Sequence, residues 1–395
     1  MRGPERMEKK YVIGVDLGGT KIYTALVDLQ GNMKKEVIVE TEAEKGELPV
    51  LQKMIDTIDY VLEGTNKDEV KAIGIGSPGP LDVANGLIVY TPNLPFKNFN
   101  IVKPIKERYG IETFLDNDAN VATLGEFMFG AGKGTENLVF ITASTGIGGG
   151  AIINGKLFRG STANALEIGH MTLMNGGPRC GCGNTGCAES LASGTAIMNR
   201  GREAAKSNCK TSLKNYETIT SKEVFQEAAK GDKEAKRIID NALNYLGITF
   251  ANAANIFDPD MIVLGGGVSN AGDIVFEKIG EVMEERCMTP IYNHCKVAKA
   301  ELGGKAGVLG AAALAITESN RRPSSSTMRR THSPSPTAAC SLSACSRSSP
   351  CALLRTSGRI TKPARPSPRP SCLRLACLRC SARSSALVPC PSPTR

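Results

Sequence analysis

The sequence lacks the segments that direct a chain into a membrane or out of the cell. No apolar run approaches the roughly 20 residues that a membrane-spanning helix needs. Residues 1–10 (MRGPERMEKK) are charged and contain no apolar stretch, so they do not resemble a secretory signal. We therefore expect a cytoplasmic protein with reduced thiols and no membrane partner.

The last part of the chain lacks acidic and large aromatic residues. Residues 321–395 contain 14 Arg or Lys and seven of the 13 cysteines, but no Asp, Glu, Phe or Tyr. This composition predicts a low-complexity segment that does not fold alone. It is either a disordered basic tail or the product of a frame shift near residue 320, and the abrupt change of composition favours the frame shift.

The net charge of +9 originates in that segment. Residues 1–320 carry 34 basic and 39 acidic side chains, so the body of the protein is mildly acidic. This balance does not indicate a nucleic acid partner. With 41% hydrophobic residues, the 395-residue chain can form the cores of two or three domains.

Apolar patterning predicts an α/β protein in two lobes. Strands come first as a meander and then alternate with helices. The predicted strands cover residues 11–16, 22–28, 36–40, 71–76, 112–115, 138–142, 150–153 and 262–264. The predicted helices cover residues 48–63, 101–109, 119–129, 189–205, 221–230, 232–255 and 305–317.

Three glycine-rich turns each follow an apolar strand, at residues 16–20, 142–150 and 264–270. Glycine exposes backbone N–H groups without hindrance from a Cβ atom, which suits close approach to phosphate oxygens. Thr20, Ser144 and Thr145 add hydroxyl donors, and Asp16 is placed to hold Mg²⁺. Any one of these loops is as consistent with an ordinary tight turn. Three of them favour a nucleotide phosphate site.

The glycine run 146–151 also imitates a dinucleotide-binding fingerprint. It leads into a strand-like segment and not into a helix, which argues against a nicotinamide-dependent dehydrogenase.

An acidic turn, Asp116-Asn117-Asp118-Ala-Asn120, joins a predicted strand to a predicted helix. Asp116 or Asp118 is expected to cap that helix. A carboxylate at a strand end that faces a cleft can also accept a proton from a substrate hydroxyl.

The segment from His170 to Cys187 contains one imidazole and three thiols, at His170, Cys180, Cys182 and Cys187. These four soft ligands suit tetrahedral Zn²⁺, and Gly181, Gly183 and Gly186 allow the backbone to bend around it. The cysteines could instead be buried apolar residues or form a disulfide. Reduced thiols and the glycine-rich spacing favour a metal. Glu167 and Glu189 flank the cluster and indicate a site for a polar ligand.

Together these motifs resemble the ROK family (repressors, open reading frames and sugar kinases), and most of all its bacterial glucokinase members. The similarity covers about residues 11–317 and rests on residues 16–20, 117–118, 167–170, 180–189 and 265–267. It implies an actin-like, ribonuclease H-like ATPase fold with a cleft between two α/β lobes, as a homodimer or higher homo-oligomer. The smaller lobe is expected at residues 10–117 plus about 305–318, and the larger at 118–304.

The resemblance also implies roles for single residues. Asp118 is the expected general base for a hexose 6-hydroxyl, with ATP as phosphate donor and Mg²⁺ as its partner. The expected sugar-binding residues are Gly79, Asn93, Asn117, Asp118, Glu167, His170 and Glu189. The expected nucleotide-binding residues are Asp16, Gly18, Gly19, Thr20, Lys21, Ser144, Thr145, Gly146, Gly265, Gly266 and Gly267. The expected ligands of a structural Zn²⁺ are His170, Cys180, Cys182 and Cys187.

Some alternatives stay open at this point. Ala163 and Leu166 stand where the family has glycine, beside the sugar-binding Glu167. Glucose is the expected sugar, but fructose, mannose or an N-acetylhexosamine fit the same motifs, and polyphosphate is an alternative donor. A sugar-sensing repressor of this family is a further alternative. It needs a DNA-binding domain before the first phosphate strand, which begins near residue 11.

Overall fold

The computed structural model describes residues 8–91 and 93–321. Both interpretations of the low-complexity segment concern residues that lie outside this range, apart from Arg321. Within the described residues no helix is long and apolar enough to cross a membrane.

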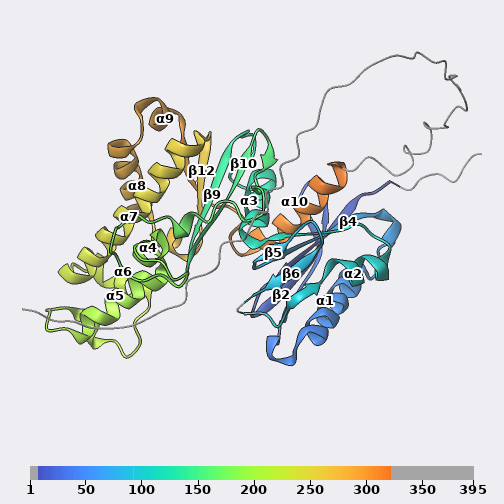
Figure 1. Cartoon of the computed structure of the whole chain (residues 1–395), viewed down its shortest axis with the longest axis horizontal. Helices are drawn as coiled ribbons and strands as arrows, with labels where there is room; N and C mark the ends of the chain where they lie inside the picture. Colours follow the sequence, from blue (N-terminus) through green and yellow to red (C-terminus); the bar gives the residue numbers. More distant parts are fainter. Residues whose placement is uncertain (1–7, 92, 322–395) are drawn as a thin grey trace, which may run out of the picture. The chain divides into compact units, whose positions relative to one another are not determined.

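The first sheet has the strand order β3-β2-β1-β4-β8, and two of its strands, β2 and β4, are labelled in Figure 1. Its strands are β1 Tyr11–Leu17, β2 Lys21–Asp28, β3 Met33–Glu40, β4 Val70–Ser77 and β8 Thr113–Asn117. β1, β2 and β3 form an antiparallel meander, whereas β4 and β8 run parallel to β1. In the strand register, Asp16 of β1 is paired with Gly76 of β4, and Gly76 is paired with Asp116 of β8. The carboxyl ends of β1, β4 and β8 therefore meet at one edge of the sheet.

Helices α1 Glu47–Leu62 and α2 Val102–Tyr109 belong to this half of the chain. α1 buries Val50, Leu51, Met54, Ile55, Ile58 and Val61. This is the spacing of one face of an amphipathic helix, and the face packs into the same apolar cluster as Ile13, Val15 and Ile75 of the sheet. A small antiparallel sheet lies between β4 and α2 in the sequence, with β5 Leu81–Asp82, β6 Leu87–Tyr90 and β7 Lys97–Asn100.

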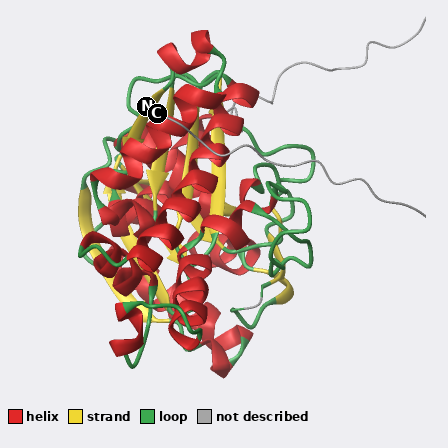
Figure 2. Ribbon diagram, turned by 90° about the vertical axis from the view of Figure 1, so that its left-hand side faces the viewer, coloured by secondary structure: helices red, strands yellow, loops and turns green. Residues whose placement is uncertain are grey.

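The second sheet has the order β11-β10-β9-β12-β13. Its strands are β9 Leu138–Ala143, β10 Ile147–Ile153, β11 Lys156–Leu157, β12 Met261–Gly265 and β13 Lys296–Lys299. The helices of this half are α3 Asp118–Phe129, α4 Ala188–Ala192, α5 Gly194–Lys206, α6 Ser221–Ala229, α7 Lys233–Phe257, α8 Asp273–Arg286 and α9 Thr289–His294. Helices lie over the strands in the turned view (Figure 2). Short 3₁₀ turns occur at 43–45, 67–69, 168–170, 212–215, 267–271 and 303–305.

Helix α10, Ala306–Arg321, contacts both halves of the chain. It packs against β1, β4 and α3, and α3 in turn packs against β9 and β10. Gly14 and Gly74 make this possible, because a Cβ atom on either would collide with the α10 backbone at Val308 or Ala311. The described residues form one unit as a result. The lobe boundaries expected from the sequence stay a prediction.

Most predicted elements are present, with several corrections. The helix predicted at 189–205 is two helices, because Ser193 is extended and caps α5 by accepting a hydrogen bond from the Ala196 N–H. The glycine loop predicted at 142–150 is much shorter, because Gly148, Gly149 and Gly150 belong to β10. The helices α8 and α9 and the strands β5, β6, β7, β11 and β13 were not predicted. The helical spacing of Val275, Ile279 and Val282 in α8 is a signal that could have been used.

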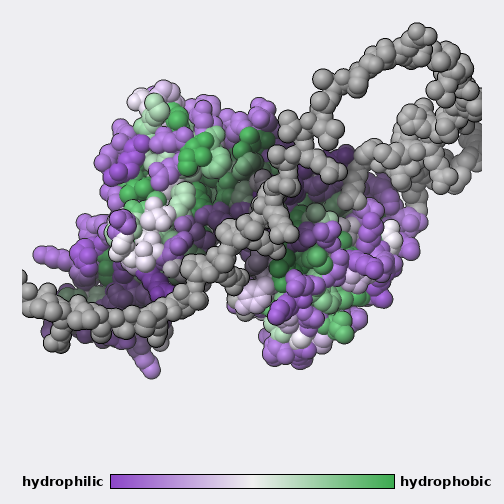
Figure 3. Space-filling model, viewed as in Figure 1, coloured by the Kyte–Doolittle hydropathy of each residue, from purple (hydrophilic) through white to green (hydrophobic). Residues whose placement is uncertain are grey.

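Hydrophilic side chains cover much of the face shown in Figure 3, with smaller apolar areas between them. Apolar side chains instead fill three buried clusters, one of which lies between the two sheets and contains residues of α3 and α10.

Candidate active site

A cavity of about 700 Å³ opens where the strand ends of both sheets meet α3 and α10. Asp16 from the end of β1 and Asp118 from the start of α3 both line it. The remaining lining includes the β9–β10 turn, the turn after β12, Glu189 and the segment before α10. Two carboxylates and several glycine turns therefore face one cavity.

The β9–β10 turn consists of Ser144, Thr145 and Gly146. The Ser144 N–H donates to the Gly146 carbonyl at 2.8 Å, and the Ser144 carbonyl accepts the N–H of Gly194 at 2.7 Å. The turn is thus fixed to the start of α5. All three residues line the cavity.

β12 ends with Gly265 and the turn after it begins with Gly266, and both glycines also line the cavity. Gly266 has a φ of +84°, which favours glycine, and a Cβ atom there would collide with the backbone of Ala143. Gly267 lies apart from this lining and faces a smaller neighbouring cavity together with Ser144 and Thr145.

A further glycine-rich segment, Gly303-Gly-Lys-Ala-Gly307, completes the lining and was missed in the sequence. It follows β13, a short strand with lysine at both ends that was not predicted, so the rule that glycine turns follow apolar strands could not have found it. Buried Glu126 of α3 fixes the residues before it: its carboxylate accepts hydrogen bonds from the N–H groups of Glu301 and Leu302, at 3.1 and 2.9 Å. Gly307 lies directly against the Asp16 carboxylate.

The turn between β1 and β2 contains the predicted residues Gly18, Gly19 and Thr20, and β2 begins at the predicted Lys21. None of these four residues lines the cavity. The Gly18 N–H donates to the Lys21 carbonyl at 2.9 Å, which closes the turn. Asn93, a predicted sugar-binding residue, packs against Gly19. A nucleotide-binding role for this turn stays a prediction.

The acidic turn corrects the prediction of the helix cap. Asn117, and not Asp116 or Asp118, is the N-cap of α3, and its side chain accepts a hydrogen bond from the Ala119 N–H at 3.0 Å. Asp116 is fully buried, and its carboxylate pairs with Arg159 at 2.6 Å. Asp118 is the first residue of α3, and its carboxylate is open to the cavity.

Both cavity carboxylates bind protons more tightly than usual. Burial raises the pKa of Asp16 to about 6; Lys21 opposes this rise and the charge of Asp118 adds to it. Desolvation by the protein around the cavity likewise raises the pKa of Asp118, although its side chain meets the cavity solvent. A raised pKa makes a carboxylate a better acceptor of a proton from a hydroxyl group.

The residues predicted to bind the sugar are only partly brought together. Glu189 lines the cavity and accepts a hydrogen bond from the Ile147 N–H at 3.1 Å. Gly79 lies beside the side chain of Asn117. Glu167 lies outside the cavity lining, with its exposed carboxylate 3.9 Å from Nε2 of His170. The roles of these residues in sugar binding stay predictions.

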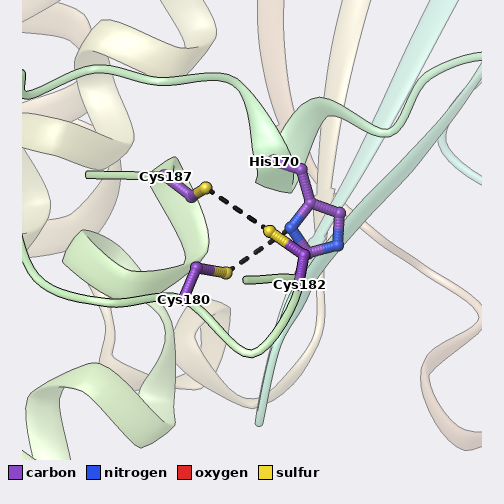
Figure 4. Close-up of side chains that lie close together, drawn as sticks. All are labelled: His170, Cys180, Cys182 and Cys187. Carbon is purple, nitrogen blue, oxygen red and sulfur yellow. Dashed lines mark hydrogen bonds between the residues drawn. The ribbon is translucent and has the colours of Figure 1, made fainter. Parts of the chain in front are cut away.

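The four predicted zinc ligands lie together (Figure 4), with all ligand atoms within 4.8 Å of one another. Sγ of Cys182 and Sγ of Cys187 are 3.7 Å apart, and Sγ of Cys180 is 3.6 Å from Nδ1 of His170. In a tetrahedral site with Zn–S bonds of about 2.3 Å, two sulfurs are separated by about 3.8 Å. The donor set and its spacing therefore fit Zn²⁺. Glu189 adjoins the cluster, with Oε1 3.6 Å from Sγ of Cys180.

Known proteins with similar sequences and structures belong to the family that the sequence motifs resemble. The model of the ROK family matches residues 12–318. A glucokinase of Thermotoga maritima is 37% identical over 313 residues, which cover 78% of this chain and 98% of the glucokinase. A crystal structure of a ROK family glucokinase from Streptomyces griseus, in complex with glucose and AMPPNP, is 33% identical with a TM-score of 0.64, over 78% of this chain and 99% of that chain.

A xylose repressor of Caldicellulosiruptor bescii is 30% identical over 78% of this chain, but the match covers only 78% of the repressor.

The predicted fold is confirmed, since the solved relatives share its two α/β lobes. The chain belongs to the ROK family.

Proposed function

We propose that this protein is a sugar kinase that transfers the γ-phosphoryl group of ATP to the 6-hydroxyl of a hexose, with glucose as the substrate. The observation that carries the proposal is the cavity in which Asp16, Asp118 and the glycine turns meet. The similarity to glucokinases over nearly their whole length supports glucose as the acceptor.

In this reaction the sugar oxygen attacks the γ-phosphorus, and the bond from that phosphorus to the leaving oxygen of ADP breaks. Asp118 takes the proton of the sugar hydroxyl, for which its raised pKa is favourable. The N–H groups of Thr145, Gly146, Gly265 and Gly266 hold the phosphate oxygens, because phosphoryl transfer depends chiefly on positioning and on stabilisation of charge.

Two metal ions belong to the proposal, with different roles. Mg²⁺ held by Asp16, directly or through water, would neutralise phosphate charge. Zn²⁺ bound by His170, Cys180, Cys182 and Cys187 would hold the segment that carries Glu189 beside the cavity. The homo-oligomer, the cytoplasmic location and the roles of Asn93, Glu167 and His170 with the sugar stay predictions.

The test is a coupled assay of ADP release with glucose, fructose, mannose and N-acetylglucosamine, with formation of the sugar phosphate measured in parallel for ATP and for polyphosphate. We expect ATP-dependent turnover that is fastest with glucose. A wild-type protein that phosphorylates none of these sugars refutes the proposed function.

The base is tested by Asp118→Asn, which keeps the size of the side chain. A general base contributes about 10²–10⁴-fold to the rate, so kcat should fall by that factor while glucose still binds in calorimetry. Asp56→Asn on the exposed face of α1 is the matched control and should retain wild-type kinetics. Substantial turnover by Asp118→Asn would reject Asp118 as the base.

A further inference from the structure

Arg159 connects three segments that are far apart in the sequence. It follows β11, and its Nε donates to the Asp116 carboxylate at the end of β8, at 2.6 Å. Its Nη2 donates to Glu318 near the end of α10, at 2.9 Å. Arg321 donates to the same oxygen of Glu318. The Arg159 side chain is only 19% exposed, so these ion pairs are largely shielded from water.

Asp116 links Arg159 to the turn that carries the proposed base. The carboxylate is 0% exposed, and Arg159 is the cation that pairs with it within the described residues. Its other oxygen accepts hydrogen bonds from the Asn117 N–H and from Nδ2 of Asn120, both at 2.8 Å. These bonds fix the backbone on either side of Asp118. Removing the guanidinium leaves a buried charge without its counter-ion, which strongly favours rearrangement of the turn.

On its other side, Arg159 anchors the segment that leads to Glu167 and His170. Most side chains from 160 to 167 are exposed. The segment folds back on itself through the Ala165 N–H, which donates to the Arg159 carbonyl at 3.1 Å. Among the described residues 158–166, Arg159 is the side chain whose hydrogen bonds reach another element. Leu166 packs against the apolar cluster of the second sheet, and the side-chain hydrogen bonds of Arg159 tie the segment to β8 and α10.

We propose that Arg159 is a positioning residue for the transfer: it joins the turn that carries Asp118 to the segment that carries Glu167 and His170. The inference rests on the proposed kinase function. A guanidinium is suited to this role because its planar fork can hold two carboxylates at once. Small displacements between a base and a bound substrate are costly in rate, so the fixed geometry matters beyond stability.

The test compares Arg159→Met, Arg159→Lys, Asp116→Asn and the double variant Arg159→Met/Asp116→Asn with wild type. For each we would measure kcat, the KM values for glucose and for ATP, glucose affinity by calorimetry, and melting by circular dichroism. Arg202→Met is the matched control, because Nε of Arg202 also donates within the chain, to the Ile219 carbonyl, but away from the cavity. It should stay within about twofold of wild type, as substitutions outside a site usually do.

We expect Arg159→Met to lower kcat about 100-fold and to raise the glucose KM about tenfold, with the ATP KM nearly unchanged. Arg159→Lys should lie between this variant and wild type, because an ammonium cannot pair with both carboxylates in the same geometry. The double variant should recover at least about fivefold of the lost activity, since it removes the uncompensated charge.

A purely structural role gives a different result. Lost activity would then follow the folded fraction, with unchanged KM values in the folded protein, and this would overturn the inference. Additive effects of Arg159→Met and Asp116→Asn would overturn it as well, because they would show that the two residues are not coupled. If Arg159→Met fails to fold, the same split of the two KM values is sought in Arg159→Lys, and its absence there is decisive. An inactive wild-type protein refutes the kinase function itself, a separate outcome.

Discussion

Gly307 offers the sharpest test of the cavity, because it is the residue of α10 that lies against Asp16. A Cβ atom built on Gly307 overlaps the Asp16 carboxylate. Non-bonded atoms prefer separations of about 3.5 Å, so Gly307→Ala must displace that carboxylate by about 1 Å. A displacement of this size at a positioning group costs about 100-fold in rate. We therefore expect kcat/KM for ATP to fall by about two orders of magnitude.

The fold itself should tolerate the change. Overpacking costs about 1–3 kcal/mol, and the better helix propensity of alanine offsets up to about 1 kcal/mol. The free energy of unfolding should therefore fall by about 0–3 kcal/mol, which lowers the melting temperature by a few degrees. Loss of activity without loss of folded protein distinguishes a displaced Asp16 from general damage.

The assay is ADP release at saturating glucose with ATP varied, together with thermal melting. Gly280→Ala is the matched control: Gly280 lies in α8, and a Cβ atom there meets nothing within 4 Å. It should raise stability by up to about 1 kcal/mol and leave the kinetics unchanged. Our reasoning is refuted if Gly307→Ala keeps kcat/KM for ATP within about threefold of wild type.

Three further predictions concern charge, metal and backbone. In EDTA, Asp16→Asn should be more stable than wild type by about 3 kcal/mol at pH 7.5, because the pKa of Asp16 rises from 3.8 to about 6 on folding. Wild type has the stability that comes from the protonated Asp16 carboxyl below pH 4, and loses it as the pH rises through about 6. Chemical denaturation in which the variant is no more stable than wild type at pH 7.5, or gains equally at pH 4, contradicts this prediction. Wild type should contain about one zinc per chain by mass spectrometry and Cys182→Ser much less, with a lower melting temperature; equal zinc contents would reject the ligand set. Ala163→Gly should raise the melting temperature by a few degrees, since Ala163 has a φ of +60° and a non-glycine residue there costs about 1 kcal/mol; an unchanged or lower value contradicts this.

The sequence alone was sufficient for features that depend on neighbouring residues. Strands that end in glycine or acidic turns, and the ligand spacing of His170, Cys180, Cys182 and Cys187, are local patterns. Asp16 and Asp118 were each singled out for this reason, and both line the cavity.

Features that depend on packing between distant segments could not be predicted. The pair between Asp116 and Arg159 requires β8 and the segment after β11 to meet, and no local pattern indicates this. The same holds for Gly307, whose contact with Asp16 follows from the position of α10 across β1. Asn117 is the cap in place of Asp116, whose buried carboxylate pairs with Arg159 instead. Short strands such as β5 are too brief for a periodic signal.

The close seating of α10 on β1 and β4 has a consequence for how mutational surveys of this protein are interpreted. Gly14 and Gly74 face the α10 backbone, so every other amino acid there forces the helix off the sheet. In a deep mutational scan scored by growth on a sugar, Gly14 and Gly74 would tolerate substitution as poorly as Asp118 does, although neither glycine lines the cavity. Intolerance at these two glycines would record whether a helix can dock, and only an assay of folded protein can separate that from a defect in catalysis.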